Sequence, residues 1–476
     1  MKYFLSVVVC LLCAVASFAQ QDNPIRIARD TLKRQVPDSL EERVSINAIV
    51  VTGNKHTKER IILREMNVKA GDIVGTDSLT SLVNLNRIRI QNLELFNEVN
   101  ISIVRVSSSE VYWRIEVQER WYIFPEVSLK LADRNFNVWW YEQNHDIKRA
   151  VIGLALSHFN FRGNQEKLSI STQVGYTQKF GINYQRPYID KKQKHGIGIS
   201  VYDTRQRETY YQTDSNRLDF AGSRQRDVWG MFEANLSYTF RPAYSTRHLF
   251  QLSYRNYRIA DTIRDLNPNF FAGGSTRADY LEAFFRIDIN RVDNWNYPLR
   301  GFKMVGTSTN RVGLNGFGFQ VFANVEMGYF HNPVGRWYWN AIFRGRLMLP
   351  ERPAYGFLGG LGGSTDYLRG YEYYVIDGPQ YALLRLDLKY EALNYTIKGI
   401  PIRVLSAIPI RIYPKIFADV GGARNPRPFN STLNNRLLYS GGFGLDLVTA
   451  YQIKLRLEYA FNHLGEKGLF LHTNSE

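Results

Sequence analysis

Residues Tyr381–Glu391 read YALLRLDLKYE, and the strict alternation of apolar and charged side chains in this stretch decides the fold. Successive side chains of a strand point to opposite faces, so the leucines share one face and the four charged residues share the other. The alternation recurs at 167–176, 281–291 and 452–461. A soluble sandwich also alternates, but many long strands with full charges inward favour a sheet closed around a wet interior, with lipid outside. In hydrocarbon every backbone group must be paired within the protein, so a span built from strands has to close into a barrel.

The first nineteen residues are predicted to be a secretory signal peptide. They have a positive start, an apolar stretch at 4–16 and small residues before Gln20. An anchor helix is the alternative, but the apolar stretch is too short to span a membrane comfortably. Both cysteines, Cys10 and Cys13, lie inside this segment. The mature chain would therefore have no disulfide, thiolate metal site or thiol nucleophile.

The chain is basic and rich in aromatic residues. It has 60 Lys and Arg against 44 Asp and Glu, a net charge of +16. This positive charge could bind nucleic acid, lie against an anionic membrane surface or line a channel. The predicted export of the protein argues against nucleic acid. Aromatic clusters at 139–141 and 337–339 would suit the two rims of a membrane barrel, with ordinary β-core packing an equal alternative. No run of 18 apolar residues follows the signal, which excludes helical membrane spans.

The sequence pattern predicts a small α+β domain, preceded by a polar segment and followed by a long segment of strands. Residues 20–43 are polar and form a flexible lead-in. Residues 44–120 follow the order strand, helix, helix, strand, strand, with Thr57 expected to cap the first helix. From 121 to 476 only strand patterns occur.

We expect sixteen strands in this second part, an even number as in single-chain bacterial barrels. They are predicted near 136–142, 150–158, 167–176, 180–187, 196–203, 228–240, 247–258, 279–290, 301–310, 317–329, 336–348, 381–391, 413–420, 438–447, 451–460 and 468–473. Connections after odd-numbered strands should face outward and be long, as 204–227, 259–278, 349–380 and 421–437 are. Residues 392–412 break this rule: either the thirteenth strand starts earlier, near Ile402, or the count slips there.

Three short motifs lie in this second part. Residues 359–374 read GGLGGSTDYLRGYEYY, a glycine-rich outer loop; residues 417–422 read FADVGG, on a strand; residues 293–301 read DNWNYPLRG, a turn that enters a strand. The candidate site residues are Leu368, Arg369, Gly370 and Tyr371 in the loop, Phe417, Asp419 and Gly421 on the strand, and Asn294, Tyr297, Pro298, Arg300 and Gly301 in the turn.

Together these motifs resemble the BamA/TamA superfamily of outer-membrane assembly and translocation barrels (bacterial surface antigen family). In that family the Arg-Gly-Tyr tip of a long loop folds back into the barrel, and its arginine meets the Phe-x-Asp-x-Gly strand. Residues 44–120 resemble its polypeptide-transport-associated (POTRA) domain. The resemblance implies a mainly β protein: a 16-stranded transmembrane antiparallel barrel preceded by one POTRA domain. The chain departs from the family in having only one POTRA-like unit and in its polar ending after the last strand.

A pairing of Arg369 with Asp419 is physically reasonable. An arginine inside a barrel cannot give up its charge and must find a carboxylate or carbonyls. Glycines at 370, 421 and 422 would let two backbones approach closely. The alternative is a solvated loop arginine and an unrelated aspartate in the lumen.

Enzymatic chemistry has little support in the sequence. The eight histidines are scattered, with no pair at metal-ligand spacing. The glycine clusters are not followed by a helix, which disfavours a nucleotide site. We therefore expect no enzyme activity, no catalytic residue, no metal and no cofactor.

The resemblance implies an outer-membrane protein insertase of a Gram-negative cell, with its barrel in the outer membrane and residues 44–120 in the periplasm. Its partners would be unfolded outer-membrane proteins, bound through the edge strand of the POTRA domain and the barrel seam, together with outer-membrane lipid. Accessory lipoproteins are further candidate partners, and nucleic acid is not. The alternatives are a dedicated polypeptide secretion channel and a passive pore or surface protein.

Overall fold

The computed structural model describes residues 43–190, 192–223, 226–243, 245–316, 318–363, 366–398, 407–426, 428, 430–449 and 454–472. The expected signal peptide and residues 20–42 of the lead-in lie outside the described residues. Contacts divide the chain into two compact units, one up to Arg120 and one from Trp121 onward.

The first unit is a four-stranded sheet with two α-helices. Its elements are β1 (Arg43–Thr52), α3 (Glu59–Leu63), β2 (Ile73–Gly75), η1 (Thr76–Ser78), α4 (Leu79–Gln91), β3 (Phe96–Arg105) and β4 (Glu110–Glu119). The strand order is β2-β1-β4-β3, with β1 parallel to β4. This is the predicted order of elements, with the three-residue β2 added.

Two local features of this unit follow from single residues. Gly53 ends β1 with φ of +88°, and a Cβ there would lie 2.0 Å from the carbonyl oxygen of Val117, so only glycine fits. The predicted helix cap at Thr57 is wrong, because the N-cap of α3 is Lys58. The Thr57 hydroxyl instead donates to the Glu119 carboxylate at 2.5 Å.

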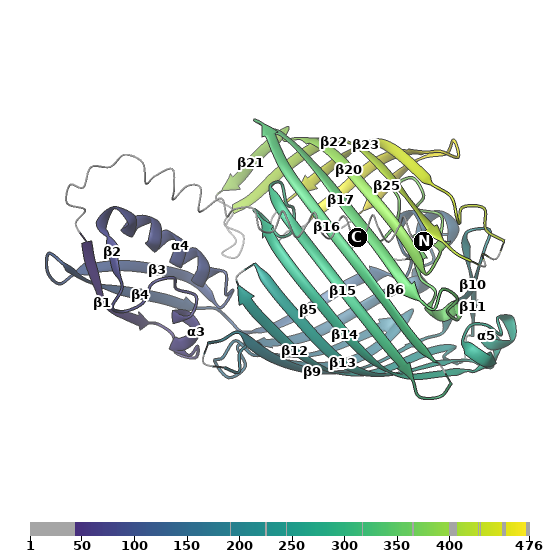
Figure 1. The fold of residues 1–476 in the computed structure, drawn as a ribbon, viewed down its shortest axis with the longest axis horizontal. Coiled ribbons are helices and arrows are strands. Elements are labelled where there is room, and N and C mark those ends of the chain that lie inside the picture. Colours follow the sequence, from purple (N-terminus) through teal and green to yellow (C-terminus); the bar gives the residue numbers. More distant parts are fainter. Residues whose placement is uncertain are drawn as a thin grey trace. The chain divides into compact units, whose positions relative to one another are not determined.

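The second unit is a closed barrel of antiparallel strands, which lie side by side in a curved wall (Figure 1). Its strands are β5 (Ile123–Leu131), β6 (Ala150–Phe159), β7 (Lys167–Gly175), β8 (Thr177–Arg186), β9 (His195–Gln206), β12 (Trp229–Ala243), β13 (Thr246–Ile259), β14 (Arg277–Val292), β15 (Gly301–Gly313), β16 (Phe319–Val334), β17 (Trp337–Leu349), β20 (Gln380–Tyr390), β21 (Leu393–Lys398), β22 (Ala407–Arg424), β23 (Leu438–Val448), β24 (Lys454–Asn462) and β25 (Lys467–His472). No helix among the described residues is long and apolar enough to cross a membrane.

The barrel has sixteen strand positions over the described residues, as predicted. β20 and β21 both pair with β22, on its second and first halves respectively, and so occupy one position. The long β22 also accounts for the irregular stretch at 392–412, because it starts at Ala407, six residues before the predicted start. The expectation that this strand begins earlier is therefore confirmed, although Ile402 itself lies outside the described residues.

The prediction of the first strand is wrong. Residues Val138–Glu142 form a single π-helical turn, and the first strand is β5. The Asn135 side chain accepts the N–H of Val138 at 2.8 Å and so bends the chain. The neighbouring aromatic rings then pack against one another, Phe136 stacked on Trp140 and Trp139 edge-on to it, instead of lining a strand. The prediction thus included one strand that is not formed and missed one that is. The number of strands is unchanged, so the predicted directions of the later strands are correct.

The inner and outer faces follow the alternation of Tyr381–Glu391. On β20, Arg385 and Lys389 are 9% and 7% exposed, whereas Leu386 and Leu388 are 42% and 37% exposed. The charged face is therefore the inner one, as predicted.

The two ends of the barrel differ in their connections. We call the end at which β5 begins the near end and the opposite one the far end. The long connections, with the hairpin β10 (Glu208–Asp214) and β11 (Arg217–Gly222) and the helix α5 (Asp261–Leu266), are at the far end. The turn between β14 and β15 is at the near end, because strands alternate in direction around the ring.

Candidate functional site

The connection between β17 and β20, residues 350–379, folds back into the barrel, and we call it the lid loop. It contains η5 (Tyr355–Phe357), β18 (Gly360–Leu361) and β19 (Ile376–Asp377). Leu368 and Tyr371 at its tip are 1% exposed and pack in an apolar cluster with β20, β22 and β23. The burial of this cluster holds the tip inside the wall.

Arg369 lies at the centre of the tip. Its Nε donates to both carboxylate oxygens of Asp419, at 3.1 and 3.0 Å, and its backbone N–H donates to the same carboxylate at 3.0 Å. Its Nη1 lies 2.6 Å from Asp387 and 3.4 Å from Glu458. The guanidinium also covers the ring of Phe417, 4.0 Å from the ring centre. The structure thus brings together the loop and strand motifs.

The carboxylates around Arg369 are shared with other buried cations, and the whole set forms one lumen network. Its members are Arg369, Arg385, Lys389 and Lys415 on the positive side and Asp387, Asp419, Asp446 and Glu458 on the negative side. Arg456 also interacts with Asp446 and Glu458, and His472 lies 3.3 Å from Glu458, so the buried anions are balanced by neighbouring cationic and polar groups. Such balance is what a low-dielectric interior requires of buried charges.

The two other tip residues fix the loop against β23 and β24. Gly370 has φ of +85°, and its carbonyl oxygen accepts from the Asn462 amide at 2.8 Å. The Tyr371 hydroxyl donates to the carbonyl oxygen of Tyr439 at 3.2 Å. The backbone of the lid loop therefore approaches these strands at the glycine, as expected.

Gly421 has a different role from the predicted one. A Cβ at Gly421 would lie 2.6 Å from the carbonyl oxygen of Ala382, which is on the neighbouring strand β20. The missing side chain therefore permits the β20–β22 pairing, and the contact is not with the lid loop.

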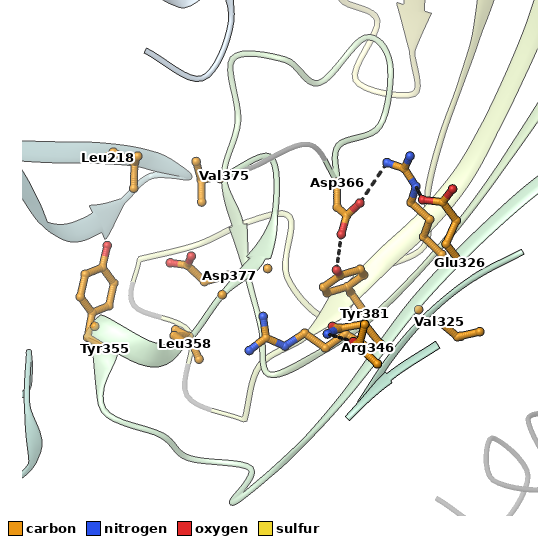
Figure 2. A pocket seen from close by; sticks show the side chains of 18 of the residues that line it. Leu218, Val325, Glu326, Arg346, Tyr355, Leu358, Asp366, Val375, Asp377 and Tyr381 are labelled. Atoms are coloured by element: carbon orange, nitrogen blue, oxygen red, sulfur yellow. Dashed lines mark hydrogen bonds and ion pairs between the residues drawn. The ribbon is translucent and has the colours of Figure 1, made fainter. Parts of the chain in front are cut away.

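The lid loop is also tied to the two strands that it connects, β17 and β20. Asp366 accepts from Arg344 at 3.0 Å. It also accepts from the Tyr381 hydroxyl, as Figure 2 shows. A cavity of about 520 Å³ lies beside these residues and is also lined by Arg346 and Asp377. Burial raises the pKa of the Asp377 carboxyl to about 6.

The turn motif lies at the near end. Gly301 begins β15 with φ of +109°, and a Cβ there would lie 2.1 Å from the carbonyl oxygen of Arg291. Arg300 donates to the Asn332 side chain near the end of β16, and Pro298 follows the buried Tyr297. Asn294 accepts the N–H of Tyr297 at 3.1 Å.

Sequence reasoning did not single out the other members of the lumen network. Asp387 and Lys389 were placed on the inner face, and Glu458 lies in one of the alternating stretches, but no partner was assigned to them. The available signal was the full charge at every second position of β20, together with Lys415 two residues before the Phe-x-Asp motif. The contacts across strands needed the register of the barrel, which alternation alone does not give.

Comparisons with known proteins agree with this architecture. Residues 44–120 match the family model described as POTRA, surface antigen variable number repeat. Among solved structures, BamA from Haemophilus ducreyi lacking POTRA domains 1–3 matches with a TM-score of 0.57 and 14% identity over 90% of this chain and 84% of that chain. CdiB from Acinetobacter baumannii matches with a TM-score of 0.51 and 13% identity over 91% of this chain and 73% of that chain. CdiB from Escherichia coli matches with a TM-score of 0.50 and 11% identity over 94% and 95%. No curated protein sequence matches the chain.

The fold and the comparisons define the class: a β-barrel of the BamA and CdiB type that follows a POTRA domain. The resemblance of the sequence to the BamA/TamA superfamily is thereby confirmed at the level of fold, with a single POTRA domain at residues 44–120.

Proposed function

We propose that this protein is an outer-membrane assembly factor that helps unfolded β-barrel clients to fold and insert. The observation that carries the proposal is the seam where β25 meets β5. Within the described part of the chain, β25 has six residues, and it pairs with β24 through six residue pairs. On β25, the carbonyl oxygen of Leu469 accepts from the Asn137 side chain at 2.8 Å, and the N–H of Leu471 donates to it at 3.3 Å.

A side-chain amide thus occupies main-chain groups that a strand could use. An arriving client strand that displaces one amide side chain breaks fewer hydrogen bonds than a strand that must displace a full ladder of backbone hydrogen bonds. The seam is therefore the position at which the barrel can offer a free edge as a template.

The outer surface supports a place in a membrane. Outward-facing aliphatic side chains are exposed on strands all around the ring: Val127, Leu129, Leu154, Leu236, Leu252, Leu281, Ile416, Leu445 and Leu469. Exposed aromatic residues lie at both ends, with Trp140 and Tyr141 at the far end and Trp337 at the near end. An apolar band between two aromatic girdles is typical of outer-membrane barrels and supports this location. On this proposal the first unit lies in the periplasm.

The POTRA domain supports the capture of unfolded clients. β3 is an edge strand of ten residues, paired on one side with β4. An extended segment can add to such an edge through main-chain hydrogen bonds, which make no demand on its sequence. No cofactor, nucleotide or enzymatic step is needed, because the client's own folding supplies the free energy. Accessory lipoproteins are a separate proposed partner.

A secretion channel is the second candidate, since two of the similar structures are CdiB proteins. It would require the lid loop to leave the lumen, and the ion pairs of Arg369 oppose that movement. An open passive pore is disfavoured by the same loop. The seam favours the insertase.

A reconstitution assay separates these functions. The full chain is placed in liposomes, an unfolded barrel client or a soluble unfolded polypeptide is added, and client folding, protection of the polypeptide inside the liposome and ion conductance are measured. An insertase accelerates client folding. Passage of the soluble polypeptide without accelerated folding would instead support a channel, and conductance alone would support a pore.

A further inference from the structure

The turn Asp293–Arg300 between β14 and β15 has a shape that two of its own side chains set. The Asp293 carboxylate accepts the N–H groups of Leu299 and Arg300 at 3.0 and 3.1 Å. The Asn294 side chain accepts those of Asn296 and Tyr297 at 2.9 and 3.1 Å. These local bonds make the turn a rigid support for Tyr297.

This turn lies across the near end of the lumen. The Tyr297 side chain is 7% exposed, and its hydroxyl donates to Asp446 on β23 at 2.8 Å. Its ring lies 5.1 Å from that of Tyr413 on β22, and the Lys389 ammonium of β20 lies 4.5 Å from its centre. Strands β16, β17 and β20 separate β15 from β22 in the ring, so the turn contacts a part of the wall that is not its neighbour.

A second tie holds the turn to the same part of the wall. The Lys454 ammonium of β24 donates to the carbonyl oxygen of Asn296 at 2.9 Å. The turn therefore has two separate attachments, one through a tyrosine hydroxyl and one through a backbone carbonyl.

Buried ion pairs connect Tyr297 to the lid loop. Asp446 lies 2.6 Å from Lys415, Lys415 lies 2.6 Å from Glu458, and Glu458 lies 3.4 Å from Arg369. Asp446 and Glu458 are 1% and 2% exposed. In an interior of low dielectric, the members of such a chain polarise and position one another.

We propose that Tyr297 is a positioning residue for the lid loop, and that the near-end turn and the lid loop are energetically coupled through Asp446, Lys415 and Glu458. Without the tyrosine hydroxyl, Asp446 draws Lys415 toward itself. Glu458 then loses part of its partner and competes with Asp419 for Arg369. The tip of the lid loop is held less firmly as a result.

The coupling gives the proposed function a regulatory step, and this part rests on that function. A client segment that enters at the near end meets the turn first. Displacing the turn breaks the bond from Tyr297 and loosens the lid loop at the other end of the lumen. Arrival of a client and release of the lid are thereby linked.

Hydrogen exchange of the purified full chain, in detergent and without any client, tests the coupling. Tyr297→Phe removes one hydroxyl and keeps the ring. The matched control is Tyr338→Phe, a tyrosine at the same end whose hydroxyl donates to Glu391 at 3.2 Å and not to the network. We expect Tyr297→Phe to speed exchange in residues 366–375 by roughly threefold to tenfold, because only part of the energy of the lost hydrogen bond to a charged group reaches the lid loop. Tyr338→Phe should leave these residues unchanged.

Two further variants keep the test decisive. Lys454→Gln releases the second tie and should speed exchange in the lid loop in the same direction. Asp446 also reaches Arg369 through Lys389 and Asp387. In a background that carries both Lys389→Gln and Lys415→Gln, Tyr297→Phe should add nothing, because both paths are cut. Faster exchange confined to 293–301, with the lid loop unchanged, would overturn the coupling. Since no client is present, a positive result with no client folding in liposomes would overturn the proposed function alone.

Discussion

The pairing of Arg369 with Asp419 can be measured by a double-mutant cycle. Arg369→Ala leaves the carboxylates Asp387, Asp419 and Glu458 in a network with one cation fewer. Breaking a buried pair in this way typically costs about 3–5 kcal/mol. Asp419→Ala should cost less, roughly 2–4 kcal/mol, because Asp387 and Glu458 still neutralise the guanidinium.

The coupling between the two residues is the quantity of interest. The bidentate contact of the Arg369 guanidinium with Asp419, from Nε and Nη2, predicts that the double variant loses about 1.5–3 kcal/mol less than the sum of the single losses. The free energies are measured by denaturant unfolding of the barrel in detergent micelles, with hydrogen exchange of the lid loop as the readout.

A matched cycle on Arg286 and Asp288 provides the control. These residues share a similar bidentate contact on β14, at 2.9 and 3.0 Å, but Arg286 is 43% exposed. Their coupling should be only ~0–1 kcal/mol. Additive losses for Arg369 and Asp419, or a coupling no larger than that of the control, would refute the idea that the lid is held by this pair.

Three further predictions concern topology, pH and a backbone position. A cysteine at Leu314, a far-end position, should be labelled by an impermeant reagent in intact cells, and one at Ser108 only after permeabilisation; the reverse result would invert the orientation. The raised pKa of Asp377 means that its contribution to stability is full below about pH 3.8 and is lost as pH rises through about 6. Asp377→Asn should therefore stabilise the barrel by roughly 1–2 kcal/mol at pH 8 and flatten the pH profile between 4 and 6, less than the full shift because the side chain is only half-buried; an unchanged profile would contradict this. Gly301→Ala should cost about 2–4 kcal/mol of stability, since φ is +109° and a Cβ would meet a carbonyl oxygen of β14. The control Gly316→Ala, where a Cβ would lie in open space, should cost about 1 kcal/mol, and equal losses in urea unfolding would count against the argument.

The sequence predicts the barrel because lipid and water impose a period of two on every strand. Residues Tyr381–Glu391 therefore show which side chains face inward without any knowledge of their neighbours. β5 escaped detection because Pro125 and Glu126 interrupt its pattern, whereas the aromatic run beside Val138 imitated a strand.

The candidate site was predictable only in part. The loop tip and Asp419 came from motifs, but Lys415, Asp446 and Glu458 join them through contacts across strands that depend on register. Tyr297 was expected in a turn. Its reach to strands that are not its neighbours follows from the folding of the turn across the lumen, which no local pattern encodes.

Capture of a folding client at the seam tests the central claim most directly. Leu469 on β25 and Ile416 on β22 are both outward-facing aliphatic residues, 55% and 59% exposed. Each is replaced by cysteine in turn, and disulfide formation with a single cysteine in the edge strand of an arriving barrel client is measured during insertion into liposomes. An insertase that opens between β25 and β5 gives strong cross-linking at 469 and little at 416. Equal cross-linking at the two positions, or none at 469 while the client still folds at an accelerated rate, would contradict the account.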